Sequence, residues 1–261
     1  MSTQGALLFA RYAYPPNELG YCGPDDASAM LRTEAAAEIG LRAREFEGAW
    51  CYLEFLAETA GLADPLDEQV VEAYWIGNEL LDRASPAALL DRMRDRFRTQ
   101  PGGTWREAGA GALAHHSFQV FDVYPWAGLL RTTGNPTALS VLDRCRIRTG
   151  LVHEVHGETA TVESAPLEWD GAAMVTGAPR RERVRWSTGG RALIACPSPG
   201  DLVALHWDWV CDVVTGEQSA RVRSLEARRR LPPEQQAVRA ANAGWGAGST
   251  PQYAPLSPVR G

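Results

Sequence analysis

Apolar residues in the first half of the chain recur at the three- and four-residue spacing of amphipathic helices. Residues that favour helix ends bound these segments: Asp25-Asp26 and Ser85-Pro86 can cap helix starts, and Gly40 and Gly61 can end helices. We therefore expect residues 1–140 to form an irregular all-α domain. The pattern predicts helices over residues 25–39, 46–60, 65–81, 86–97 and 112–123, and a short one after Asn135-Pro136.

The pattern changes near residue 143, where β-forming residues cluster or alternate between glycine turns. The alternation places the Trp207 and Trp209 side chains on one face of a strand. Several strands and one helix in so short a segment are typical of a small β-barrel. Strands are predicted within residues 145–157, 159–169, 180–186, 191–196 and 200–214, followed by a helix to about Arg230.

Together these patterns predict an α+β protein with three parts. A helical domain covers residues 1–140, and a β-barrel with a C-terminal helix covers residues 143–230. A Pro/Gly-rich tail covers residues 231–261, where we expect little regular structure.

Composition narrows the class of protein further. The 261 residues are 45% hydrophobic, enough for a sizeable core, and no apolar run approaches the roughly 20 residues that span a bilayer. The N-terminus lacks the basic start and apolar core of a secretory signal, so we expect a cytoplasmic protein with no membrane partner. The net charge is −6, and the arginines are scattered, which disfavours nucleic-acid binding.

Several kinds of chemistry are excluded by residue type and spacing. The chain has no lysine, which excludes Schiff-base and P-loop lysine chemistry. Its 5 cysteines form no Cys-x-x-Cys pair, so zinc-ribbon and thioredoxin-like sites are excluded, and we expect reduced thiols. Cys196 and Cys211 are expected to be structural, and the acidic neighbours of Cys22 oppose the lowered pKa of a reactive thiol. No catalytic motif is present, so we expect no enzymatic activity.

The second region resembles the HypC/HupF family of hydrogenase maturation chaperones. A cysteine, Cys145, precedes glycine-punctuated strands, as it does in that family. The strongest match is residues 200–206, Gly-Asp-Leu-Val-Ala-Leu-His, which follow the family pattern of Gly-Asp, β-forming residues and a histidine. Residues 215–220 then lead into a helix, as in the family. The helical domain and the segment 187–199 have no counterpart there, and Cys145 lies inside this chain rather than at its start.

This resemblance implies an OB-like barrel and a role in the maturation of [NiFe]-hydrogenase. In the family, the cysteine and the histidine hold the Fe(CN)2CO fragment destined for the hydrogenase active site, so Cys145 and His206 are the implied metal ligands. A thiolate and an imidazole both suit such an iron. The implied partners are the immature hydrogenase large subunit or other maturation proteins.

The remaining histidines are weaker candidates for metal ligands. His153 and His156 are three residues apart on a strand and face opposite sides. His115 and His116, if helical, point about 100° apart, which argues against joint ligation of one ion. One of that pair is a candidate lining residue of a pocket near Asp122 and Tyr124.

Two other functions stay open. In the first, the protein is a non-catalytic interaction module in which the barrel is a relic and His206 is an ordinary hydrogen-bonded barrel residue. In the second, it is an enzyme with a pocket between the helical domain and the barrel, using His115, His116 or His206. The second predicts a deep cleft at that junction with convergent polar groups.

Overall fold

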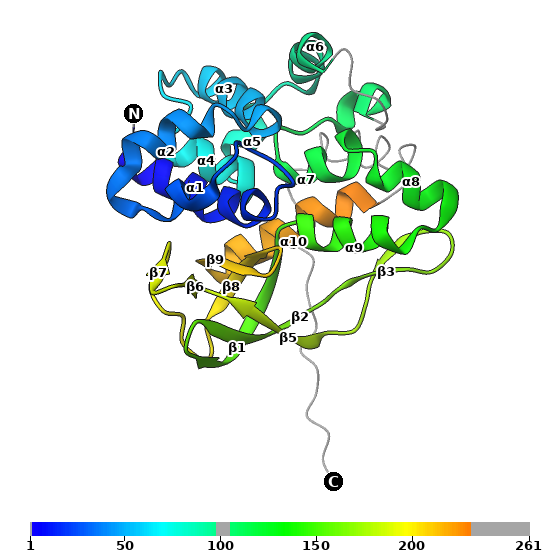
Figure 1. Ribbon diagram of the computed structural model, residues 1–261. Coiled ribbons are helices and arrows are strands. Elements are labelled where there is room, and N and C mark those ends of the chain that lie inside the picture. Colours follow the sequence, from blue (N-terminus) through cyan, green and yellow to red (C-terminus); the bar gives the residue numbers. More distant parts are fainter. Residues whose placement is uncertain (1, 98–104, 231–261) are drawn as a thin grey trace.

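The computed structural model describes residues 2–97 and 105–230; the predicted tail at 231–261 lies outside these residues. Helices form the first half and a β-barrel followed by a helix forms the second, which confirms the predicted α+β class (Figure 1). The helices of the first half are α1 (Thr3–Glu18), α2 (Ala36–Ala43), α3 (Glu47–Ala60), α4 (Glu68–Trp75), α5 (Leu80–Arg83), α6 (Pro86–Arg96), α7 (His116–Phe118), α8 (Trp126–Thr133) and α9 (Pro136–Cys145). Short 3-10 turns lie at Ala27–Leu31, Thr33–Ala35, Trp105–Glu107 and Gly109–Gly111, and a π-helical turn at Gln119–Val123.

Several predicted helix ends are confirmed by their capping contacts. The Ser85 hydroxyl accepts a hydrogen bond from the Ala88 amide at the start of α6. Asn135 caps α9, with Pro136 in its first turn, and α3 ends at Gly61 in the left-handed conformation that glycine favours.

Other expectations about the helices are wrong. The sequence pattern missed α1, which continues through Pro15 and Pro16. The predicted stop at Gly40 is a buried position inside α2, and the start of the predicted helix 25–39 instead forms two 3-10 turns, Ala27–Leu31 and Thr33–Ala35. The predicted helix 65–81 breaks at Gly77, whose φ of 92° is outside the helical range.

Five strands close into a barrel in the order β1-β2-β5-β9-β8. Counted along the chain, this order is 1-2-3-5-4, and the third strand pairs with the fifth in parallel, as expected for an OB-like barrel. The barrel interior is filled by valines, Ala160 and Leu205. The strands are β1 (Arg148–His156), β2 (Thr159–Ser164), β5 (Arg180–Arg185), β8 (Leu202–His206) and β9 (Trp209–Val213), with hairpins β3 (Leu167–Trp169)–β4 (Met174–Thr176) and β6 (Ser187–Thr188)–β7 (Arg191–Ala192) outside the barrel.

Two strand predictions need correction. The predicted strand 191–196 is reduced to the two residues of β7. Trp207 is not in a strand but in the β8–β9 turn, with a φ of 54°, so it does not share a strand face with Trp209. A tight turn needs a positive φ that alternation of residue types does not reveal.

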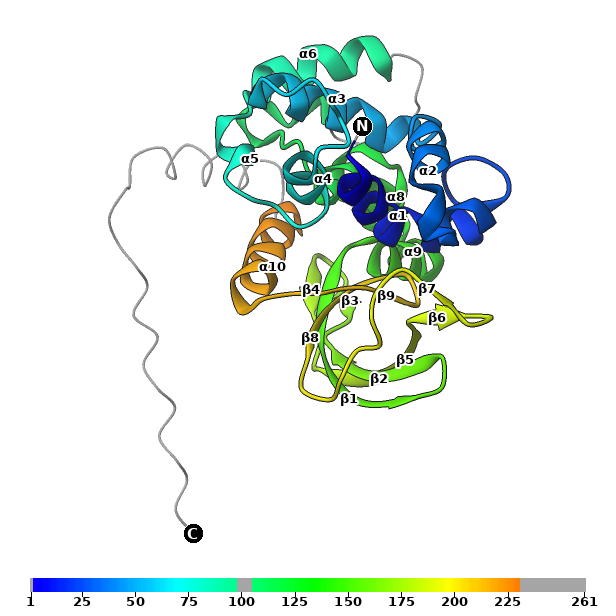
Figure 2. The same cartoon turned by 90° about the vertical axis from the view of Figure 1, so that its left-hand side faces the viewer.

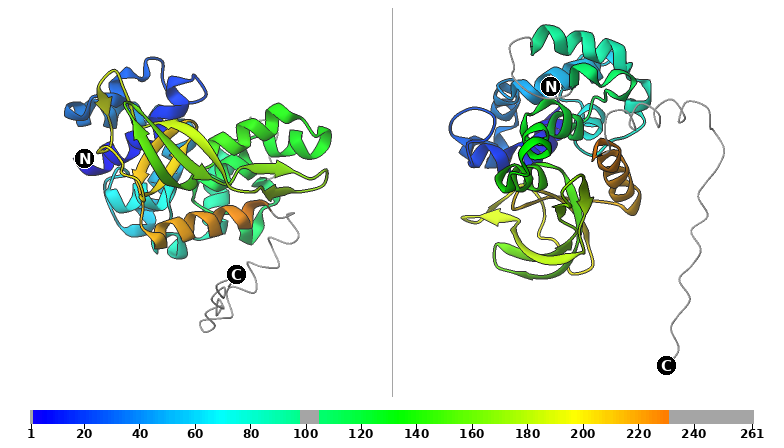
Figure 3. Two further views of the ribbon diagram at one scale, coloured as in Figure 1. Left: turned by 90° about the horizontal axis from the view of Figure 1, so that it is seen from below. Right: turned by 90° about the vertical axis from the view of Figure 1, so that its right-hand side faces the viewer.

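The helices pack directly on one end of the barrel (Figure 2). The largest core cluster joins residues of α1, α3 and α4 to Ala204, Trp209 and Cys211 of the barrel strands. The last helix, α10 (Gly216–Arg230), runs alongside the barrel and contacts β1, β8 and α7 (Figure 3). The predicted boundary at 140–143 is therefore crossed by a common core. No helix in the described part of the chain is long and apolar enough to cross a membrane.

Candidate metal centre

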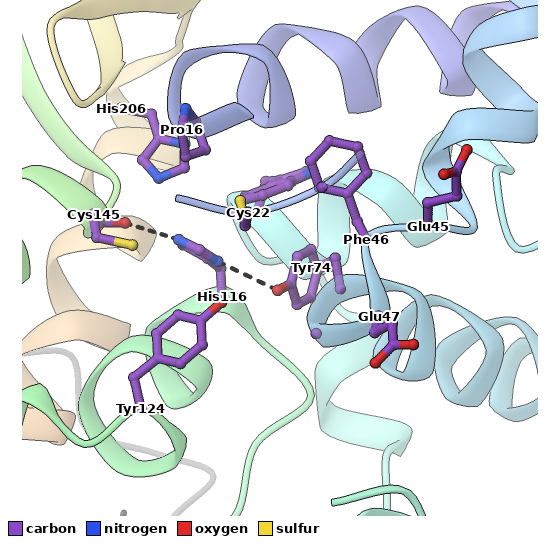
Figure 4. A pocket seen from close by; sticks show the side chains of 14 residues that line it. Pro16, Cys22, Glu45, Phe46, Glu47, Tyr74, His116, Tyr124, Cys145 and His206 are labelled. Atoms are coloured by element: carbon purple, nitrogen blue, oxygen red, sulfur yellow. Dashed lines mark hydrogen bonds between the residues drawn. The ribbon is translucent and has the colours of Figure 1, made fainter. Parts of the chain in front are cut away.

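One side chain from each of three distant segments meets at the junction of the helices and the barrel. Ligand atoms of His116, Cys145 and His206 all lie within 4.8 Å of one another. His116 is the first residue of α7, Cys145 the last of α9, and His206 the last of β8 (Figure 4). Cys145 and His206, the two predicted ligands, are thus brought together, and His116 joins them.

The His206 ring has one nitrogen fixed and the other free. Nδ1 lies 2.6 Å from the backbone carbonyl oxygen of Tyr12, in α1. Because a carbonyl oxygen only accepts, Nδ1 carries the proton and Nε2 carries a lone pair. Nε2 is buried and has no hydrogen-bond partner. Metal-binding histidines typically donate their other ring N–H to a carbonyl oxygen in this way, which fixes the tautomer.

Cys145 is positioned by the end of α9 and by a network around the next residue. Arg146 is buried and pairs with Asp143 at 2.9 Å and with Glu226 of α10 at 2.8 Å. The amide of Trp207, next to His206, donates to the Arg144 carbonyl at 2.8 Å. The turn after β8 is therefore tied to the end of α9, which holds His206 beside Cys145.

Two hydrogen bonds hold the His116 ring, one at each of its nitrogens. Its Nε2 donates to the Cys145 carbonyl at 2.8 Å, and its Nδ1 lies 3.3 Å from the Tyr74 hydroxyl (Figure 4). A hydroxyl can donate or accept, so Tyr74 can satisfy Nδ1 in either tautomer. His116 can therefore release the carbonyl and offer Nε2 to a metal without leaving Nδ1 unpaired. Its neighbour His115 is engaged elsewhere, with Nδ1 on Ser117.

A cavity of about 260 Å³ adjoins the three ligands. Helix and loop residues Pro16, Cys22, Phe46 and Trp75 line it together with Cys145 and His206, so it lies at the junction of the two parts. The ring of Trp75 lies 4.6 Å from that of His116 and 5.7 Å from that of His206. The walls thus combine apolar and aromatic side chains with the polar residues Glu45, Glu47, Tyr74 and Tyr124.

Burial keeps the candidate ligands uncharged. It lowers the pKa of His116 to about 4 and the pKa of His206 well below its usual value. Burial also raises the pKa of the Cys145 thiol far above its usual value. The imidazoles are therefore neutral at pH 7 and ready to ligate, whereas the thiol loses its proton only when a cation replaces it.

The other histidines that the sequence offered as candidates lie in different parts of the structure. His153 and His156 are near glutamates on the outer side of the barrel, away from the cavity. One member of the pair His115-His116 was expected to line a pocket near Asp122 and Tyr124. His116 does line the cavity, together with Tyr124. Asp122 instead pairs with Arg229. Sequence reasoning missed His116 as a third ligand, because no spacing relates it to Cys145 or His206.

The arrangement of donors fits a transition metal. The set is one sulfur and two imidazole nitrogens, which suits iron, zinc or cobalt and not the hard cations magnesium and calcium. With three protein ligands and an adjacent cavity, coordination positions are left for other ligands.

Searches with the whole chain found no match among curated proteins and none among solved structures. A family model does match, over residues 1–239, which includes the helices, the barrel and α10. The chain therefore belongs to DUF6390, a family of unknown function.

Proposed function

We propose that this protein is an accessory protein of [NiFe]-hydrogenase maturation that holds the Fe(CN)2CO fragment as cargo. Cys145 and His206 bind the iron, and His116 is a third donor. The observation that carries the proposal is the free, buried Nε2 of His206, on a ring that places a nitrogen within 4.8 Å of the Cys145 sulfur and a His116 nitrogen. The resemblance of residues 145–220 to the HypC/HupF family provides the identity of the cargo.

The adjacent cavity supports a fragment that brings its own ligands. One water molecule takes up about 30 Å³ of the liquid, so the roughly 260 Å³ beside the ligands has room for three diatomic groups. The Trp75 ring beside both histidines reduces the contact of the iron with bulk water. A site with few protein ligands suits a protein that passes its metal on, because few bonds must break.

The helical part provides the extra contact surface in this proposal. It has no counterpart in the HypC/HupF family, yet it contributes His116 and the Tyr12 carbonyl that orients His206. The expected partner is the immature hydrogenase large subunit or another maturation protein.

The test is anaerobic co-expression of the tagged protein with a hydrogenase maturation system, followed by infrared spectroscopy of the purified protein. We expect cyanide and carbonyl stretching bands in the wild type and in a His153→Ala control, whose histidine lies outside the cavity. The bands should be lost in Cys145→Ser and His206→Ala. Circular dichroism checks that each variant is folded.

The outcomes separate the alternatives. If no bands appear but a large subunit co-purifies with every variant, the protein is an interaction module and the iron-carrier role fails. If neither bands nor a hydrogenase partner appear, the maturation role fails altogether.

A second function, a metal-dependent enzyme, is favoured by one observation. The cavity lies at the junction of helices and barrel and gathers polar groups, as the enzyme alternative predicts. Three protein ligands with an open position are also the pattern of catalytic zinc sites. Purification of the native protein with a stoichiometric divalent metal and an unidentified organic ligand, without infrared bands, would favour this function.

A further inference from the structure

We infer that Cys22 is a fourth donor of this centre and completes a Cys2His2 set for a bare divalent cation such as Zn²⁺ or Fe²⁺. The inference rests on the metal site of the proposed function. The inference differs from the proposed function in the metal species that is bound. The Fe(CN)2CO fragment brings three ligands of its own and therefore does not need a second thiolate. A bare cation lacks such ligands and is expected to recruit a fourth one from the protein.

Cys22 lines the same cavity as the other three side chains (Figure 4). It is a free thiol in the segment between α1 and the first 3-10 turn. The three ligand atoms that lie within 4.8 Å of one another do not include the Cys22 sulfur, so the Cys22 side chain must turn to reach a shared cation.

The loop that carries Cys22 is built to hold it there. The Asn17 side-chain amide donates to the Cys22 carbonyl at 2.9 Å and to the Pro24 carbonyl at 2.6 Å. Gly23 has a φ of 85° and packs so closely on Phe46 that a Cβ would lie 2.3 Å from the ring. The backbone of Cys22 and of the two residues after it is therefore held in place, and the Cys22 side chain is left to turn toward a metal.

The environment of Cys22 explains why its thiol is not an ordinary surface cysteine. Burial raises the pKa of Cys22 to about 12, so the sulfur is protonated in the absence of a cation. A change of its χ1 rotamer moves the sulfur without moving the backbone. The unpartnered Nε2 of His206 gives independent evidence that the cavity receives a cation.

Cobalt(II) titration of the reduced, full-length protein tests this inference. Thiolate-to-cobalt charge transfer in the near ultraviolet grows with the number of sulfur ligands, and strong visible bands report tetrahedral geometry. We expect tetrahedral bands in the wild type, and a charge-transfer intensity about half as large in Cys22→Ser and in Cys145→Ser. A Cys196→Ser control, which removes an exposed thiol outside the cavity, should match the wild type.

Two other outcomes of the cobalt titration would contradict the inference. If Cys22→Ser keeps the full charge-transfer intensity while Cys145→Ser loses all of it, the site has one thiolate and Cys22 is not a ligand, but the metal centre stands. If the wild type shows only weak octahedral bands, the centre does not hold a bare cation and the inference fails, whereas the proposed function fails only if the infrared bands of the iron fragment are absent. Circular dichroism of the variants excludes unfolding as the cause of a lost signal.

Discussion

The affinity of this centre for a divalent cation should rise steeply with pH. The cause is the Cys145 thiol, whose pKa burial raises far above its usual value, so that it is protonated throughout the neutral range. A metal that binds the thiolate must release this proton. Burial lowers the pKa of His116 to about 4 and the pKa of His206 well below its usual value, so both rings are neutral at neutral pH and neither competes for protons there.

The magnitude follows from the number of protons released. One proton per metal makes the apparent affinity tenfold higher per pH unit, or 100-fold between pH 6 and pH 8. This corresponds to about 2.7 kcal/mol, since each unit is worth about 1.36 kcal/mol. If Cys22 is also a ligand, two protons are released and the slope doubles to 100-fold per unit, because its pKa of about 12 also lies above this range.

Zinc competition with a coloured chelator, measured at several pH values, gives the slope. Calorimetry in buffers of different ionisation enthalpy counts the released protons independently. The wild type should release two protons, and Cys22→Ser and Cys145→Ser one each. An affinity that does not change between pH 6 and pH 8 in the wild type would refute the assignment of a buried thiol as a ligand.

Three further predictions concern the support of the centre. Tyr74→Phe should lower the zinc affinity by about 10–100-fold with little loss of stability, because it removes the hydroxyl that lets His116 change tautomer. Competition titration with a coloured chelator measures the zinc affinity. Arg146→Met should lower the free energy of unfolding in urea by about 3–5 kcal/mol, since it leaves the buried Glu226 carboxylate without its main cation. Gly23→Ala should weaken zinc binding and lower the melting temperature, because its positive φ and the close aromatic ring leave no room for a Cβ; an unchanged melting temperature would contradict the described loop packing.

Local sequence signals predicted those elements whose ends are set by nearby residues. Ser85 and Asn135 cap their helices through amides two or three residues away, and Gly61 ends α3 by its own backbone freedom. The alternating pattern of residues 159–164 likewise predicted a strand with one buried face. Such contacts span a few residues and can be recognised in the sequence.

Elements stabilised by distant contacts were missed or misplaced. Helix α1 contains Pro15 and Pro16, which disfavour a helix locally, but its apolar face is buried against α2, α4 and the barrel. Gly40 is a weak helix former that is kept inside α2 because its position is buried. In both cases tertiary packing outweighs the intrinsic preference of the residue.

For the candidate centre, the sequence by itself determined the residue types and, through a family resemblance, the pair Cys145 and His206. Only the tertiary structure decided that these two side chains meet, that His116 joins them, and that Cys22 lines the same cavity. The physical reason is that these residues lie on four segments brought together by a core that the helices and the barrel share. No periodicity or spacing along the chain encodes such a meeting point, because it depends on how whole elements pack.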